Sequence, residues 1–214
     1  MSSVAVIDYG MGNLHSISKA LQFAAPNNTV LITAHAEQIL QAERVVFPGV
    51  GAIRDCMQAL HNTGLSDVIV EVAQSRPLLG ICLGMQALLS DSEENNTTSC
   101  LDIISGHVRH FPANLKDCQG QVLKIPHMGW NQVHQQYDHP LWRNIAQDSR
   151  FYFVHSYYAC PDDPAVTAAI SEYPEPFSCA LSKDNIFAVQ FHPEKSHTVG
   201  LQLLKNFISW DGCV

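Results

Sequence analysis

The chain has 214 residues, of which 46% are hydrophobic, and its formal net charge is −8. A chain of this length can bury a sizeable core, so we expect residues 1–214 to form a single domain. The acidic surface implied by this charge repels phosphate, which argues against a nucleic acid or an anionic membrane surface as a partner.

The first half of the chain alternates apolar runs with helical patterns. After the first apolar run, Leu14, Ile17 and Leu21 recur at helical spacing. We therefore predict an α/β fold with a mostly parallel central sheet flanked by helices, whose active residues collect at the carboxyl ends of the strands. The predicted buried strands are 3–8, 28–33, 44–49 and 77–81, and further helices are predicted at 51–64 and 65–74.

The second half of the chain consists of short β-prone segments and ends in an amphipathic helix. Its composition does not change in a way that would mark a second domain. The polar stretch 91–99 is expected to be a surface loop. The additional β segments are 106–111, 121–133, 150–160, 165–170, 177–182 and 186–191, and the helix is 198–210.

Targeting, cofactor and cysteine signals are weak. The N-terminal residues lack the basic lead of a secretory leader, and no stretch reaches the length of a membrane span. The seven cysteines are scattered and form no C-x-x-C pair, so we expect a cytoplasmic location, no metal site and mostly inert thiols. Gly10 and Gly12 resemble the start of a dinucleotide fingerprint, but His15 replaces its third glycine, so we expect no nucleotide cofactor.

Residues 78–89, LLGICLGMQALL, place one cysteine where an apolar run gives way to a helical pattern. A strand that turns into a helix at Gly80-x-Cys82-x-Gly84 has the layout of a nucleophile elbow, where a strained backbone needs small neighbours. The helix that begins near Leu83 directs free N–H groups at the sulfur, which favours thiolate over thiol. A buried structural cysteine, with glycines that serve helix–strand packing, is an equal alternative.

A thiolate that attacks a carbonyl needs a base and a residue that orients the base. In AVQFHPEKS, a predicted strand delivers His192, and Glu194 follows two residues later. Extended residues at this spacing point the same way, so Glu194 is expected to reach the imidazole.

An oxyanion formed by that attack needs N–H donors. The amide of Leu83 is one candidate. The Val50–Gly51 amides in FPGVG are the other, although a plain turn explains that loop equally well.

The segments PGVG, GICLGMQ and FHPEKS, in this order, resemble the class I glutamine amidotransferase family. The resemblance implies a flavodoxin-like α/β fold and the hydrolysis of the glutamine side-chain amide, with ammonia passed to a synthase. It implies that Cys82 is the nucleophile, His192 the general base and acid, and Glu194 its orienting partner. It further implies substrate contacts from Gln86, Glu94, Ser156 and Tyr157.

Segments elsewhere, including IDYGMGNLHS and IPHMGWN, resemble a narrower family, the glutaminase subunits of imidazole glycerol phosphate synthases. That resemblance implies histidine biosynthesis and a heterodimer with a separate (β/α)8 cyclase subunit. Met128, Trp130 and Asn131 suit the centre of such an interface, although Trp130 fits an ordinary core equally well. Asn13 and Lys195 flank the catalytic ends and are expected on the same face.

Three other functions fit parts of this pattern. One is a glutaminase or thiol hydrolase that acts without a partner, and another is a non-catalytic binding subunit that keeps the triad as scaffold. A thiol redox protein is the third, but no resolving cysteine lies near Cys82 in the sequence.

Overall fold

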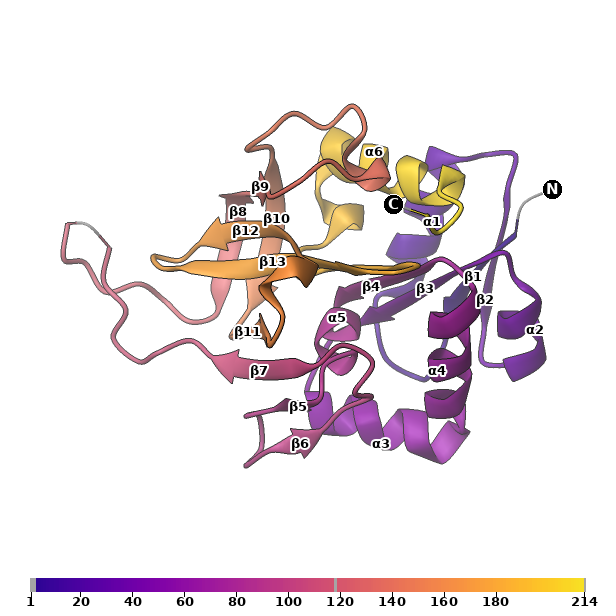
Figure 1. The fold of residues 1–214 in the computed structure, drawn as a ribbon, viewed down its shortest axis with the longest axis horizontal. Helices are drawn as coiled ribbons and strands as arrows, with labels where there is room; N and C mark the ends of the chain where they lie inside the picture. The colour runs from indigo at the N-terminus through magenta and orange to yellow at the C-terminus, as the bar shows by residue number, and fades with distance from the viewer. Residues whose placement is uncertain (1–2, 118, 214) are drawn as a thin grey trace.

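The computed structural model describes residues 3–117 and 119–213, so Cys118, one of the cysteines expected to be inert, lies outside the described residues. Strands and helices alternate in the first half as predicted (Figure 1). Gly64 has φ +70°, and this left-handed residue ends one helix and begins the next. The elements are β1 Ser3–Ile7, α1 Leu14–Ala24, β2 Thr29–Thr33, α2 Ala36–Gln41, β3 Arg44–Gly49, α3 Ile53–Thr63, α4 Leu65–Ser75, β4 Leu78–Cys82 and α5 Leu83–Ala87.

The second half adds short strands, three 3₁₀ turns and one long helix. Its elements are β5 Asp91–Ser92, β6 Thr98–Ser99, β7 Gly106–His110, β8 His127–Gln132, β9 His134–Gln135, β10 Arg150–His155, β11 Tyr157–Pro161, β12 Thr167–Glu172, β13 Pro176–Lys183, β14 Ile186–Val189 and α6 His197–Ser209, with 3₁₀ turns at Pro140–Trp142, Pro164–Val166 and Pro193–Lys195.

The strands of the first half form the predicted parallel sheet, in the order β2-β1-β3-β4. The C-terminal strand β14 pairs in parallel with β4, with Val189 opposite Ile81. Gly49, at the end of β3, lies opposite Cys82 at the end of β4. The ends of β3, β4 and β14 therefore meet at one edge of the sheet, although β14 lies more than a hundred residues further along the chain.

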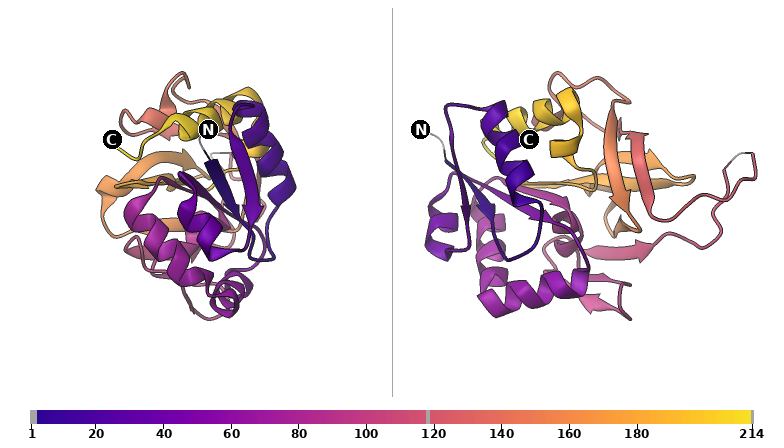
Figure 2. Two further views of the ribbon diagram at one scale, coloured as in Figure 1. Left: turned by 90° about the vertical axis from the view of Figure 1, so that its right-hand side faces the viewer. Right: turned by 180° about the vertical axis from the view of Figure 1, so that it is seen from behind.

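Helices cover both faces of this sheet, as Figures 1 and 2 show. Successive residues of β1 alternate between the two hydrophobic cores. Val4 and Val6 pack in the core that includes residues of α1 and α6, whereas Ala5 and Ile7 pack in the core that includes residues of α3 and α4. Burial on both faces explains why these strands are apolar without alternation.

Most of the additional β segments extend the same sheet with antiparallel partners, through β13, β11 and β7. The predicted segment 150–160 is split at Ser156: β10 pairs with β8 in a separate two-stranded sheet, whereas β11 joins the main sheet. The predicted strand at 121–133 begins only at His127.

Two expectations are corrected, one about burial and one about secondary structure. Strand β2 is not buried, because it is an edge strand with β1 as its sheet neighbour, and the side chains of Leu31 and Ile32 are exposed. The stretch 91–99 is not a plain loop: β5 and β6 form an antiparallel hairpin, and β5 also pairs with β7.

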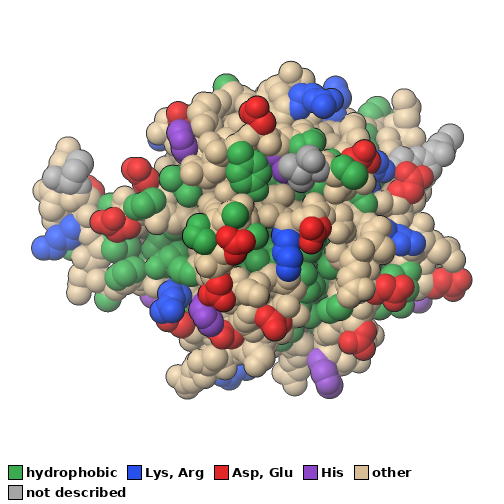
Figure 3. All heavy atoms as spheres, viewed as in Figure 1, with side chains coloured by type: hydrophobic (Ala, Val, Ile, Leu, Met, Phe, Trp, Pro, Cys, Tyr) green, Lys and Arg blue, Asp and Glu red, His purple; other side chains and the backbone are tan. Residues whose placement is uncertain are grey.

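Acidic and basic side chains are interspersed over the face of the molecule that Figure 3 shows. None of the described helices has both the length and the apolar character that a membrane crossing requires. Within residues 3–117 and 119–213, the His, Cys, Asp and Glu side chains form no group of three or more that could hold a metal ion.

Candidate active site

The backbone at Cys82 has the strained geometry predicted for a nucleophile elbow, with φ 55° and ψ −109°. A non-glycine residue in such a conformation costs about 1–3 kcal/mol. The two flanking glycines have a different task, which is close packing. A Cβ on Gly84 would lie 2.0 Å from the carbonyl oxygen of Phe47, and one on Gly80 would lie 3.1 Å from Cβ of Ala188. Both explanations of the Gly80-x-Cys82-x-Gly84 pattern therefore apply: the backbone of Cys82 is strained, and the two glycines allow the helix and the strands to pack closely.

His192 and Glu194 form a buried pair just beyond the end of β14. Nδ1 of His192 lies 2.8 Å from Oε1 of Glu194, and the two side chains are 2% and 4% exposed. The predicted extended spacing is wrong in detail: Pro193 begins a 3₁₀ turn, and Glu194 lies in that turn. His192 itself is extended, and its backbone N–H donates to the carbonyl of Tyr152.

The electrostatics of His192 favour a proton on its ring. Burial lowers the pKa of His192, but its interactions with Cys82 and Glu194 outweigh burial and raise the pKa to about 10. Because the carboxylate accepts from Nδ1, Nε2 is the atom that can exchange a proton with the thiol of Cys82. Nε2 is itself buried.

Cys82 and His192 line a cavity of about 310 Å³ at the carboxyl ends of the strands. Its wall also contains Pro126, Val154 and His155, which the sequence did not single out. The structure brings every residue expected at the substrate or the oxyanion to this cavity, namely Val50, Gly51, Leu83, Gln86, Glu94, Ser156 and Tyr157.

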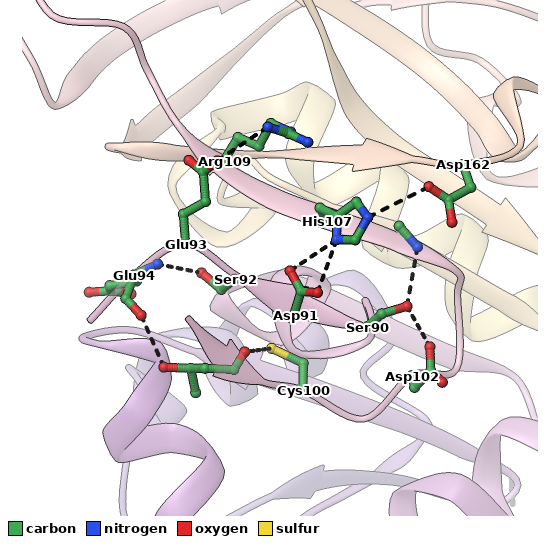
Figure 4. A network of polar contacts seen from close by, with 12 residues as sticks. Ser90, Asp91, Ser92, Glu93, Glu94, Cys100, Asp102, His107, Arg109 and Asp162 are labelled. Atoms are coloured by element: carbon green, nitrogen blue, oxygen red, sulfur yellow. Dashed lines mark hydrogen bonds and ion pairs between the residues drawn. The ribbon is translucent and has the colours of Figure 1, made fainter. Parts of the chain in front are cut away.

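Glu94 reaches the cavity from the hairpin of β5 and β6, which polar contacts hold in place (Figure 4). In that network His107 contacts the carboxylates of Asp91 and Asp162. The carboxylate of Glu94 accepts from the backbone N–H of Ile53 at 3.0 Å, at the positive end of α3. This hydrogen bond fixes the side chain of Glu94 at the wall of the cavity.

The residue that the sequence missed is Gln190, which is fully buried between Cys82 and Gln86. Its Nε2 lies 3.7 Å from the sulfur of Cys82. The sequence signal that could have identified Gln190 is its position two residues before His192, just after an apolar strand.

Two of the expected interface residues, Met128 and Trp130, are exposed rather than in the core. The side chain of Met128 is 61% exposed and that of Trp130 is 39% exposed. Trp130 stacks on His197, with ring centroids 5.1 Å apart. Trp130 as an ordinary core residue is therefore wrong.

The other three expected interface residues have intramolecular neighbours. Asn131 donates from its side chain to the carbonyl of Glu172 at 2.8 Å. Lys195 lies with Nζ 5.9 Å from the ring centroid of Tyr152. Asn13 lines a small second cavity that also contacts His192 and Glu194.

Comparisons with known proteins agree with this geometry. The chain matches the family model "Glutamine amidotransferase class-I" over residues 5–210. It is 59% identical to the imidazole glycerol phosphate synthase subunit HisH of Methylococcus capsulatus, over 99% of this chain and 98% of that protein. It is 58% identical to the subunit of that name from Nitrosococcus oceani, over 99% of both chains.

Among solved structures, a putative GMP synthase protein from Thermoplasma acidophilum is similar in fold. Its TM-score is 0.70 at 19% identity, over 98% of this chain and 93% of that one. The family model spans nearly the whole chain, and the two HisH subunits are more than half identical to it over at least 98% of their length. The chain therefore belongs to the class I glutamine amidotransferases and, within them, to the HisH subunits of imidazole glycerol phosphate synthase.

Proposed function

We propose that this chain hydrolyses the side-chain amide of glutamine with Cys82 as nucleophile, His192 as general base and acid, and Glu194 as its orienting carboxylate. The observation that carries the proposal is the buried His192–Glu194 pair, whose imidazole lines one cavity together with the strained Cys82. The chain acts as a single glutamine amidotransferase domain. The pairing of β14, near the C-terminus, with β4 supports this, because the site draws residues from both parts of the chain.

The first half of the reaction forms a thioester. The thiolate of Cys82 attacks the carboxamide carbon of glutamine, and the C=O electron pair moves onto the oxygen. That oxyanion accepts N–H groups from Leu83 and from the Val50–Gly51 loop. Protonated His192 then gives its Nε2 proton to the departing nitrogen, the C–N bond breaks, and ammonia leaves behind a γ-glutamyl thioester.

The second half hydrolyses the thioester. His192, now neutral, takes a proton from water as the water oxygen attacks the acyl carbon. The C–S bond breaks, its electron pair returns to the sulfur as thiolate, and glutamate is released; His192 keeps the proton taken from water, which restores the ion pair of Cys82 and His192. Gln86, Glu94, Ser156 and Tyr157 hold the substrate during both halves, since all four line the cavity.

The ammonia goes to a partner. We propose that this is a separate (β/α)8 cyclase subunit, in a cytoplasmic heterodimer, which uses the ammonia to form imidazole glycerol phosphate and an aminoimidazole carboxamide ribonucleotide in histidine biosynthesis. Exposed Met128 and Trp130, with Asn13, Asn131 and Lys195, form the face that binds it. Docking there closes the site, so that ammonia leaves into the partner.

Glutamate formation by the wild-type chain and by Cys82→Ala, each with and without the cyclase and its nucleotide substrate, tests this proposal. The expected result is turnover that depends on Cys82 and rises strongly with the partner. Equal wild-type rates with and without the partner would refute the coupling. Ammonia transfer by Cys82→Ala would show instead a non-catalytic subunit.

A further inference from the structure

Gln190 is a polar side chain at the centre of the site that the mechanism above does not use. It is fully buried, and its backbone N–H donates to the carbonyl of Cys179. Its side-chain oxygen accepts from Nε2 of Gln86 at 2.9 Å, and its own Nε2 donates to the sulfur of Cys82 at 3.7 Å. A buried amide with a hydrogen bond at its oxygen and another at its nitrogen is held in one orientation.

The orientation of the Gln190 amide is set by the backbone carbonyl of Tyr157, which is linked to Gln190 through the side chain of Gln86. The carbonyl of Tyr157 can only accept, so the group of Gln86 that lies 3.1 Å from it is the NH₂ group. The second hydrogen of that NH₂ group points at Gln190, which must therefore present its oxygen to Gln86. The NH₂ group of Gln190 is left to face the sulfur of Cys82.

This arrangement distinguishes the two forms of the sulfur. A thiolate only accepts hydrogen bonds, and an N–H donor aimed at it stabilises the charged form. A thiol gains less from the same donor, because neutral sulfur is a weak acceptor. In the proposed mechanism, the proton that the sulfur gives up goes to Nε2 of His192, which lines the same cavity as Cys82.

We propose that Gln190 is a further catalytic residue, a fixed hydrogen-bond donor that stabilises the Cys82 thiolate, and that Gln86 is the positioning residue that sets its orientation. The inference rests on the proposed function and adds a second group to the activation of the nucleophile. When the thioester forms, the sulfur loses its charge, and this donor then favours the return of the thiolate as the leaving group in hydrolysis.

The test is the pH dependence of Cys82 alkylation by iodoacetamide in the full chain, followed at the Cys82 peptide by mass spectrometry. Gln190→Leu removes the donor, and we expect the midpoint of the profile to rise by about one pH unit or more. Gln190→Glu keeps an acceptor for Gln86 but turns an oxygen toward the sulfur, so its midpoint is expected to rise further. Ser182→Ala, a buried polar change in β13 opposite Phe187 of β14, is the control and should leave the midpoint unchanged.

An unchanged midpoint in folded Gln190→Leu or Gln190→Glu would overturn the inference. If neither variant folds, the side-chain amide proton of Gln190 in the wild-type chain supplies the same test by NMR. Its resonance is expected to move at the pH where alkylation accelerates, and a constant resonance would overturn the role. Failure of a glutamine-mimicking electrophile to label wild-type Cys82 would refute the proposed function itself, which separates the two claims.

Discussion

Replacing Glu194 by Gln removes the charge that supports His192 while keeping the size of the side chain. The pKa of His192 rises from 6.5 to about 10 through its interactions with Cys82 and Glu194. That difference corresponds to about 5 kcal/mol at roughly 1.36 kcal/mol per pKa unit, of which the Glu194 carboxylate supplies only a part, because this variant keeps the interaction with Cys82. An amide can also present NH₂ to Nδ1 and so select the tautomer that cannot accept the thiol proton. We expect kcat of Glu194→Gln to fall roughly 10³- to 10⁴-fold, by analogy with the carboxylate-to-amide change in a serine-protease triad.

The assay is glutamate formation at saturating glutamine in the presence of the cyclase and its nucleotide. Glu71→Gln, at an exposed position of α4, is the matched control and should retain wild-type turnover. The KM for glutamine should change little, because Glu194 does not line the substrate cavity. A kcat for Glu194→Gln close to that of the wild type would refute the role of the pair.

Three further predictions concern packing, docking and acid stability. Gly84→Ala places a Cβ 2.0 Å from the Phe47 oxygen, so we expect urea denaturation to show a loss of about 3 kcal/mol or more; a variant as stable as wild type would contradict this packing. Trp130→Ala should weaken cyclase binding about tenfold or more in calorimetry while unfolding free energy changes by less than about 1 kcal/mol, and unchanged affinity would remove Trp130 from the interface. Burial lowers the pKa of His127 to about 4 and that of His155 to about 3, so the unfolded chain binds more protons below the unfolded pKa of 6.5. The free energy of unfolding, from urea titrations, should therefore fall as pH drops from 6.5 toward 4. Burial also lowers the pKa of His139 to about 4, so this fall should shrink but not vanish in a His127→Gln, His155→Gln double variant; a fall as steep as in the wild type would contradict the role of the two rings.

The sequence predicted those parts of the site whose geometry depends on residues close together in the chain. An apolar run followed by Gly80-x-Cys82-x-Gly84 encodes a strand, a tight turn and a helix that packs closely, and the structure has all three. The parallel order of the strands followed from their alternation with helices. The closeness of His192 to Cys82 needed one more step, the rule that parallel strands share a carboxyl edge.

The remaining features depend on long-range pairing, which local pattern does not encode. Residues 28–33 are as apolar as a central strand, and only the sheet order makes β2 an edge with exposed Leu31. The break at Ser156 arises because β10 and β11 pair with different sheets. Gln190 resembled any polar residue after a strand, since its function depends on Gln86 and Cys82, which are over a hundred residues away.

The central claim is that Cys82 is the nucleophile, and labelling with a glutamine-mimicking electrophile tests it most directly. Six cysteines among the described residues are free, and Cys213 is the most accessible of them, so peptide mapping separates reactivity from exposure. We predict that the electrophile modifies Cys82 alone at one equivalent, abolishes turnover, and is blocked by excess glutamine. Modification at another cysteine, or full turnover after Cys82 is labelled, would contradict the account.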